Sequence, residues 1–334
     1  MQSRFFSRML FFAAVIFFAF GTSSSRAADS VPAKKIVLYT ALTATTPQIP
    51  LWSAIGEGWP KGYELQVRYW KNLDDLRGVM LAGKGDLWVG NLEGFAQAAK
   101  RGAPVTLIAV TAWKKFYFVT SSKEKVMSLE DIADILKKTG EPLAVTPQDG
   151  PALGIVEAMG KKGGMTFKVA PMPPQQLMLE IMRGTRHYAL MPEPLLSLLL
   201  AKKKDIRIVA SLEEEYARRF GGPARLPLAG IAANTAFIKA HPEMAKELVQ
   251  RMQGAVLKLR SSRKEAAAVL PEPVRETLGM AVLEASLERD LIYVEPAGNV
   301  REQVAAFLKM ILPELRNTPA GDGMPSDSFI LPES

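Results

Sequence analysis

Short apolar runs alternate with longer amphipathic stretches along the first third of the chain. The apolar runs have the length of strands and occur at residues 36–40, 65–69, 87–90 and 105–110. The amphipathic stretches have helical spacing and occur at residues 49–55, 73–82 and 93–100. Strands that alternate with helices in this way predict α/β layers.

The C-terminal third is predicted to be mainly helical. Pro242 stands at a helix-start position and opens a long helical pattern that runs to residue 259. Two further helices are predicted at residues 274–289 and 300–312. After Asn317 the chain is rich in Gly, Pro and Ser, and we expect it to be mobile.

One order of elements occurs twice in the chain. A shift of 101 residues aligns residues 76–110 with residues 177–211 without a gap. Both segments have the order helix, Gly turn, strand, loop, helix, strand, although their residue identity is low and a chance alignment is the alternative. The shared order predicts two similar α/β lobes. Residues 116–122 are expected to cross to the second lobe, and residues 226–233 to return.

Composition limits the classes of function. The chain has 334 residues, beyond the size at which single cores stop growing, and 48% hydrophobic and 23% charged residues are typical of globular proteins. It has no cysteine and two histidines, so disulfides, thiolate chemistry and zinc sites are not expected. Neither GxxxxGK[ST] nor GxGxxG occurs. We therefore expect no cofactor and no metal.

The formal net charge of +8 is spread along the chain. The longest basic run, residues 202–204, lacks interleaved aromatic residues, so nucleic acid is not an expected partner. A solvated helix end explains this run better.

The N-terminus has the pattern of an export signal. Residues 1–8 are positive, residues 9–20 form an unbroken apolar run, and residues 21–28 are small and polar. Twelve apolar residues are short of the roughly 20 that span a bilayer as a helix. The pattern predicts a secretory signal peptide cleaved near Ala27 or Ala28, with an uncleaved anchor as the alternative. Export without cysteine is typical of a bacterial periplasm.

Four stretches together resemble a known family. They are residues 38–52 (LYTALTATTPQIPLW), 83–102 (GKGDLWVGNLEGFAQAAKRG), 128–151 (SLEDIADILKKTGEPLAVTPQDGP), and 184–203 followed by 234–249. In order and spacing they resemble the periplasmic solute-binding proteins of ABC importers, in the branch that handles nitrate, taurine, alkanesulfonates and thiamine-pyrimidine precursors. The likeness covers residues 36–313. It implies a type II periplasmic binding protein: two Rossmann-like α/β lobes, two crossing segments, a ligand cleft between the lobes, and an ABC importer permease at the inner membrane as partner.

The domain organisation that follows has five parts. They are a signal peptide at 1–28, the first part of lobe 1 at 29–117, lobe 2 at 118–226, the return of lobe 1 with C-terminal helices at 227–317, and a mobile tail at 318–334. The resemblance implies a monomer. Thiamine-pyrimidine synthases share the fold but are expected to need a Cys-rich site, and this chain has no cysteine.

Loops that follow strands supply the candidate ligand-binding residues, because ligands of open α/β sheets bind beyond the carboxyl ends of the strands and at helix N-termini. In lobe 1 the candidates are Tyr39, Thr40, Thr43, Thr46, Trp52, Asn91, Glu93 and Trp113. In lobe 2 they are Thr146, Gln148, Asp149, Met191 and Glu193. Helix capping by the threonines and Asn91, core packing of Trp113 and a tight turn at Asp149 are the structural alternatives.

The charges of these candidates leave the solute open. Helix N-termini and Lys114 or Lys115 favour an anion, whereas Glu93, Asp149 and Glu193 would repel one. Aromatic residues favour a flat organic molecule, so we expect a small organic solute, heteroaromatic or amine-bearing, with a nitrate-like or sulfonate oxyanion as the alternative. A ligand-sensing subunit and a periplasmic enzyme on the same fold are the other hypotheses. We expect no catalysis, because no catalytic constellation is visible.

Overall fold

The computed structural model describes residues 34–59, 62–165, 167–315 and 323–332, all within one compact unit, Ala33–Ser334. The predicted signal peptide at 1–28 lies outside these residues. Among the residues described, no helix is both long and apolar enough to cross a membrane.

The strands are β1 Lys34–Ala41, β2 Tyr63–Trp70, β3 Leu87–Asn91, β4 Val105–Ala112, β5 Phe116–Thr120, β6 Leu143–Val145, β7 Val169–Pro171, β8 Tyr188–Pro192, β9 Arg207–Ser211, β10 Ala229–Asn234 and β11 Ile292–Pro296. The helices of the first half are α1 Ile49–Gly56, α2 Leu73–Leu81, α3 Leu92–Lys100, α4 Leu129–Thr139, α5 Pro151–Gly163 and α6 Pro174–Arg183. The helices of the second half are α7 Leu195–Lys202, α8 Leu212–Phe220, α9 Thr235–Ala240, α10 Pro242–Ser261, α11 Arg263–Ala268, α12 Glu272–Leu278, α13 Met280–Ser286 and α14 Arg301–Ile311. Short 3-10 turns lie at Gly298–Val300 and Pro313–Leu315.

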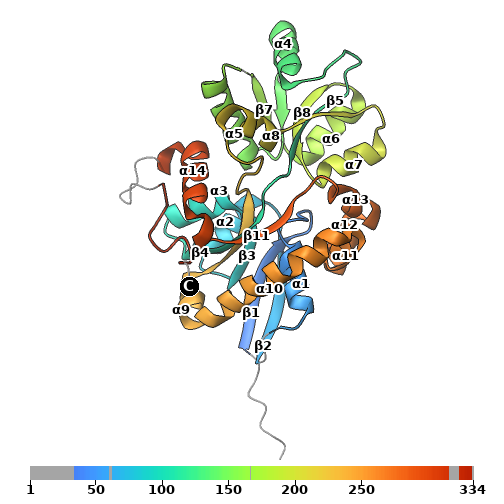
Figure 1. Ribbon diagram of the computed structural model, residues 1–334. Coiled ribbons are helices and arrows are strands. Elements are labelled where there is room, and N and C mark those ends of the chain that lie inside the picture. The colour runs from blue at the N-terminus through green and yellow to red at the C-terminus, as the bar shows by residue number, and fades with distance from the viewer. Residues whose placement is uncertain (1–33, 60–61, 166, 316–322, 333–334) are drawn as a thin grey trace, which may run out of the picture. The chain divides into compact units, whose positions relative to one another are not determined.

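The strands form two sheets with equivalent topology (Figure 1). Sheet A has the order β11-β4-β10-β3-β1-β2, and sheet B has the order β7-β6-β8-β5-β9. Apart from β11, each sheet places one antiparallel strand, β10 or β5, between two strands that are parallel to each other. This equivalence matches β3 with β8 and β4 with β9, as the 101-residue shift predicts. We call sheet A with its helices lobe 1, and sheet B with its helices lobe 2.

Hydrophobic patterning decides where each strand lies. In β4, VTLIAVTA, every residue is buried, as expected for a strand with neighbours on both sides and layers on both faces. In β2, YELQVRYW, exposure alternates, because this strand forms the edge of sheet A and turns Glu64, Gln66 and Arg68 to solvent. The sequence predicts both strands for this reason.

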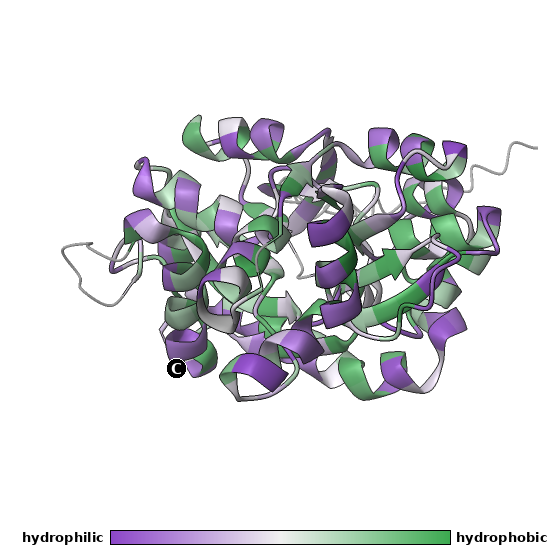
Figure 2. Cartoon of the chain, turned by 90° about the horizontal axis from the view of Figure 1, so that it is seen from above, coloured by the Kyte–Doolittle hydropathy of each residue, from purple (hydrophilic) through white to green (hydrophobic). Residues whose placement is uncertain are grey.

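Helices cover both faces of each sheet. In lobe 1, α1, α9 and α10 share a core with one face of sheet A, while α2, α3 and α14 share a core with the other. In lobe 2, α6 and α7 cover one face of sheet B, and α4, α5 and α8 the other. Figure 2 shows hydrophilic residues on the outward turns of the peripheral helices and hydrophobic residues on the strands they enclose. This arrangement is the layered α/β architecture that the alternating pattern predicts.

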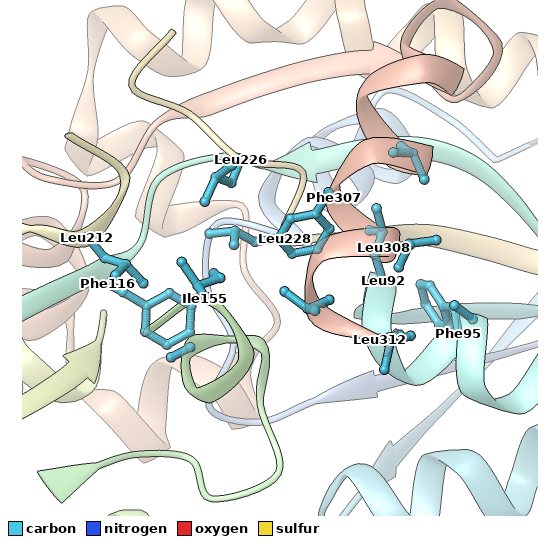
Figure 3. Packing of buried hydrophobic residues seen from close by; sticks show 14 of the residues in the cluster. Leu92, Phe95, Phe116, Ile155, Leu212, Leu226, Leu228, Phe307, Leu308 and Leu312 are labelled. Atoms are coloured by element: carbon cyan, nitrogen blue, oxygen red, sulfur yellow. The ribbon is translucent and has the colours of Figure 1, made fainter. Parts of the chain in front are cut away.

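One hydrophobic core runs through both lobes. Figure 3 shows Phe116, Ile155 and Leu212 of lobe 2 joined through Leu226 and Leu228 to Leu92, Phe95 and Phe307 of lobe 1. The lobes pack tightly between α5 and α14, where a Cβ added to Gly154 would lie 3.0 Å from the Cβ of Ile311. The lobes therefore pack together on this side through apolar side chains.

Three sequence predictions differ from the structure. Residues 116–120 are not only a crossing: they form β5, the central antiparallel strand of lobe 2, so the chain enters sheet B two residues before the predicted boundary at 118. The helix predicted at 274–289 is divided into α12 and α13 at Gly279, whose φ of +79° does not fit a helix. Residues 323–332 of the predicted mobile tail are held in place, because Phe329 and Ile330 are buried, the Leu107 N–H of β4 donates to Phe329 O, and the Leu331 N–H donates to Leu107 O.

Candidate functional site

The strand directions bring the loops that follow the parallel strands of each sheet to one edge. In sheet A, β1, β3 and β4 end at this edge and the antiparallel β10 and β11 begin there. In sheet B, β6, β8 and β9 end at the corresponding edge and β5 begins there. We call the loops at these edges the junction: residues 42–48, 91–93, 113–115, 146–150, 193–194, 211–213 and 289–291.

The loop at 42–48 is fixed by a single glutamine. The Gln48 carbonyl oxygen accepts hydrogen bonds from Thr40 Oγ1 at 2.7 Å and from Trp52 Nε1 at 2.9 Å, and its amide donates to the backbone oxygens of Ala41 and Ala44. Thr111 Oγ1 of β4 donates to Pro47 O at 2.7 Å. These bonds fold the loop across the end of sheet A and bury Thr45 and Thr46.

Asp290, directly before β11, is the partner of Thr46. Thr46 Oγ1 donates a hydrogen bond to Asp290 Oδ2. The pKa of Asp290 is raised to about 7, mainly by burial and to a smaller extent by the carboxylates of Glu193 and Glu213, while the Lys115 charge and the Thr46 hydrogen bond oppose the rise. Asp290 is therefore a buried acid that ionises near neutral pH.

The neighbouring residue, Arg289, connects the two lobes. Arg289 Nε donates to Glu193 Oε1 at 2.6 Å, and Arg289 Nη2 donates to Ser197 Oγ at 2.6 Å. Tyr117 of β5 donates its hydroxyl to the Arg289 backbone oxygen at 2.6 Å. Burial also raises the pKa of the Tyr117 hydroxyl, which remains a neutral donor. A single lobe 1 residue thus makes three hydrogen bonds to lobe 2.

The two fully buried carboxylates of lobe 2 at the junction, Glu193 and Glu213, are fully partnered. Glu193 Oε1 accepts from Arg289, and Glu193 Oε2 accepts from the Ser197 backbone N–H at 2.9 Å. Glu213 accepts from the backbone N–H groups of Lys115 and Phe116 and from Ser211 Oγ. Burial raises the pKa of Glu213, and these three donors work against the rise.

Glu93 lies in the first turn of α3, next to a second contact between the lobes. Burial raises the pKa of Glu93 to about 7, with Arg77 lowering it and Asp149 raising it. Arg77 of lobe 1 lies 3.7 Å from the Asp149 carboxylate of lobe 2. Asn91 Oδ1 accepts from the Gly94 backbone N–H at 3.1 Å and so caps α3.

An aromatic and cationic stack stands where the chain crosses between the lobes. The Arg225 guanidinium lies 5.2 Å from the centroid of the Trp113 ring and 4.7 Å from that of Tyr293. Arg225 belongs to the returning segment and Trp113 to the outgoing one, so cation–π contacts join the two crossings. Trp113 is fully buried.

Several buried polar atoms of the junction have no hydrogen-bond partner in the part of the chain that the structure describes. They are Thr45 Oγ1, Glu93 Oε2, Trp113 Nε1, Lys115 Nζ, Thr146 Oγ1 and Asp290 Oδ1, and Arg225 Nε, beside Trp113, is in the same condition. Buried polar groups are hydrogen-bonded in the great majority of proteins, so such a concentration points to an external partner. The set holds both donors and acceptors, which suits a polar organic ligand.

Two hollows elsewhere contain none of the predicted ligand-binding residues. One, of about 240 Å³, lies over α5 and is lined by Val156, Glu157, Gly160, Lys161, Met165, Phe167 and Val169. A smaller one lies between α1 and α10. The orphaned polar atoms therefore identify the candidate site better than hollows do. Among the described residues, no three or more of His, Asp and Glu are grouped as a metal site would require.

Solved structures share this architecture. The chain is similar to an ABC transporter protein from Parabacteroides distasonis, with a TM-score of 0.66 and 17% identity over 91% of this chain and 100% of that chain. It is also similar to the periplasmic aliphatic sulphonate binding protein SsuA from Escherichia coli, with a TM-score of 0.64 and 13% identity over 91% of this chain and 94% of that chain. A third similar structure is the periplasmic nitrate-binding protein NrtA from Synechocystis, with a TM-score of 0.64 and 12% identity over 87% of this chain and 84% of that chain. Neither a family model nor a curated protein matches the sequence.

The chain has the type II periplasmic binding protein fold. This agrees with the resemblance seen in the sequence and with the predicted fold class. At these identities the likeness concerns the fold, and the ligand has to be argued from the residues of this chain.

The type II periplasmic binding protein fold brings some predicted site residues to the junction. Thr46, Trp113 and Thr146 are buried there, and Glu93 lies close by with an unpartnered oxygen. Asp149, in the junction loop 146–150, lies 3.7 Å from the guanidinium of Arg77 of lobe 1. These residues come from three loops of lobe 1 and one of lobe 2, as a cleft between lobes requires.

Other predicted site residues bond to or pack against other parts of the chain, or are exposed. Thr40 and Trp52 are bound to Gln48, Asn91 caps α3, and Glu193 is bound to Arg289 and Ser197. Met191 is fully buried in the core beneath α6 and α7. Tyr39 lies in the middle of β1 beside Trp88, and Thr43 and Gln148 are exposed.

The candidate list lacks Thr45, Arg77, Lys115, Arg225, Arg289 and Asp290. The sequence marks Lys115 as a cation near the crossing segment and marks Thr45 as a member of the threonine-rich loop. Asp290 and Arg289 give no local signal, because their partners Thr46 and Glu193 are 244 and 96 residues away in the chain.

Proposed function

We propose that this protein is the extracytoplasmic solute-binding protein of an ABC importer, which captures a small organic solute by closure of its lobes and delivers it to a membrane permease. The observation that carries the proposal is the junction. Loops of both lobes meet there and bury donors and acceptors that have no partner in the described chain. Solved structures of the same fold are named as sulphonate- and nitrate-binding proteins, which supports the proposal.

Closure of the lobes would couple ligand binding to the equilibrium between open and closed arrangements of the protein. A ligand that contacts both lobes favours the arrangement in which they meet, and its differential affinity sets how far the equilibrium moves. The lobes proposed to close on the ligand are lobe 1 and lobe 2 as the two sheets define them, with β5 (Phe116–Thr120) in lobe 2. No residue of the junction is assigned a catalytic role in this proposal.

The proposed location is the periplasm, with the signal peptide cleaved near Ala27 or Ala28 and the mature protein a monomer. The export pattern of residues 1–28 and the periplasmic names of the similar structures support it. An oxyanion is the second candidate solute. The unpartnered Lys115 ammonium and the sulphonate- and nitrate-binding neighbours favour it.

A thermal-shift screen over sulfonates, nitrate, pyrimidines, amines and aromatic acids tests the proposal. A ligand at 100 times its Kd adds about 2.7 kcal/mol to the free energy of unfolding, so one class should raise Tm clearly. Calorimetry should then give one site per chain, and small-angle scattering a smaller radius of gyration with ligand. The proposal fails if none of the classes stabilises the protein. The site assignment fails if Thr46→Ala, Trp113→Ala and Glu93→Gln all leave the affinity unchanged.

A further inference from the structure

Lys115 and Asp290 are an oppositely charged pair that do not bond to each other. Lys115 lies in the crossing between β4 and β5, and Asp290 lies between α13 and β11. Lys115 is close enough for its charge to oppose the rise in the pKa of Asp290. Yet Lys115 Nζ and Asp290 Oδ1 are both buried, and neither has a hydrogen-bond partner within the described residues. The Lys115 ammonium and the Asp290 carboxylate, which we call the two poles, therefore each lack the hydrogen bond that burial normally requires.

Leaving these poles unbonded is costly. A buried polar group without a partner costs about 1–3 kcal/mol, and a charged one costs more. The same junction shows that carboxylates here can be fully bonded, since Glu193 and Glu213 each fill both oxygens or accept three donors. A cost of this kind retained at a charged pair is typical of a binding site, where stability is exchanged for function.

The surrounding charge selects among ligands. The carboxylates of Asp290, Glu193 and Glu213 act on one another, while Lys115 and Arg289 are the cations beside them. Three acids and two bases leave one excess negative charge when all are ionised. An anion without a donor would satisfy Lys115 but would meet Asp290 unfavourably, whereas a solute with both kinds of group would satisfy both poles. The neighbouring Thr45 hydroxyl, also unpartnered, adds a further polar contact.

We infer that Lys115 and Asp290 form a two-pole subsite for an amine-bearing solute: its acidic or carbonyl group bonds to the Lys115 ammonium, and its amine bonds to Asp290 Oδ1. This rests on the proposed function and narrows its substrate class from small organic solutes to those that carry an amine beside an acceptor. Thr46 holds the other oxygen of Asp290 and so restricts the rotation of the carboxyl group, which leaves Oδ1 available to a ligand.

Matched solute pairs test the subsite on the full mature chain. The probes are β-alanine against propionate, and 2-aminoethanesulfonate against ethanesulfonate, measured by calorimetry and thermal shift at pH 8. We expect the amine-bearing member of at least one pair to bind at least tenfold more tightly. Asp290→Asn should abolish this preference, and Lys115→Met should weaken both members of the pair. Lys203→Met and Asp205→Asn, in a surface ion pair of lobe 2, are the controls and should change neither affinity.

A measurement without ligand separates a binding role from a structural one. Asp290→Asn keeps an oxygen for Thr46 and removes an unpaired charge, so Tm of the ligand-free protein at pH 8 should rise by about 2 °C. A fall in Tm, or equal binding of both members of each pair, would overturn the subsite. If a solute without an amine binds and closes the lobes, the importer function stands and the subsite is wrong. If no solute of any class binds, both proposals fail.

Discussion

Buried carboxylates at the junction fall into two groups that follow the two lobes. In lobe 2, Glu193 and Glu213 accept hydrogen bonds from a guanidinium, a hydroxyl and backbone N–H groups. In lobe 1, Asp290 and Glu93 each keep one buried oxygen without a partner among the described residues. Burial raises the pKa of both lobe 1 acids to about 7.

The difference separates architecture from function. Fully bonded buried charges stabilise one arrangement of the chain. Removing one partner of such a pair leaves the remaining charge buried without a partner, which is strongly destabilising. Incompletely bonded charges lower the stability of the empty protein and remain available to a ligand. On this argument Glu193 joins the two lobes and Glu213 fixes the start of β5, whereas the lobe 1 acids are the ones we propose to respond to solute or proton.

The largest expected effect comes from Glu193→Ala. The substitution leaves Arg289, which is only 21% exposed, without its carboxylate, and leaves the Ser197 backbone N–H without its acceptor. We expect the free energy of unfolding to fall by about 3 kcal/mol, measured by urea titration.

The control is Glu247→Ala, which removes one partner of the exposed Glu247–Arg251 pair on α10. A loss of about 0.5 kcal/mol or less is expected there. Equal losses in the two variants would mean that Glu193 is not a structural acid, and the contrast between the lobes would disappear.

Glu93→Gln should have a smaller effect that depends on pH. Between pH 4.5 and about 7 the native state keeps a proton on Glu93 that the unfolded chain has lost, so the free energy of unfolding of the wild type falls as pH rises through this window. Glutamine has no such proton. We expect the variant to match the wild type at pH 4 and to be more stable by about 2 kcal/mol at pH 8.

Urea titrations at half-unit intervals of pH would measure this slope. Glu64→Gln, on the exposed face of the edge strand β2, is the control and should leave the slope of the wild type unchanged. A Glu93→Gln profile parallel to that of the wild type would show that Glu93 is not an unsatisfied acid.

The sequence predicts the architecture of the lobes better than the chemistry between them. Strand and helix patterns are local, so the repeat of residues 76–110 in 177–211 appears as equivalent places for β3, β8, β4 and β9. Loops after strands are local too, and this rule nominates Thr46, Glu93 and Thr146, which the structure places at the junction. The Thr46–Asp290 bond joins residues 244 positions apart, and no local pattern marks Asp290 as buried.

Two misplaced elements had signals that local patterning underweighted. Gly279 interrupts the helical pattern at 274–289, and a glycine with positive φ ends α12. Phe329 and Ile330 are apolar residues within a Gly- and Pro-rich tail, and both are buried against lobe 1. Whether an apolar side chain has a site to occupy depends on the completed fold, which for these two includes Leu107 of β4.

The smallest expected effect extends the comparison from acids to hydroxyls. Thr146 and Thr111 are both fully buried, but Thr111 Oγ1 donates to Pro47 O at 2.7 Å, whereas Thr146 Oγ1 has no partner in the described chain. Valine has nearly the same shape as threonine, so the substitution removes the hydroxyl with little change in packing. Thr111→Val should lower the free energy of unfolding by about 1 kcal/mol, because Pro47 O loses its donor. Thr146→Val should raise the free energy of unfolding by up to about 1 kcal/mol and weaken binding of the solute, because the hydroxyl that it removes bonds only to the ligand.

Urea titration of the two variants side by side, with and without a solute found in the screen, measures both effects. A loss of stability in Thr146→Val equal to that in Thr111→Val would place Thr146 with the structural groups and remove lobe 2 hydroxyls from the binding site.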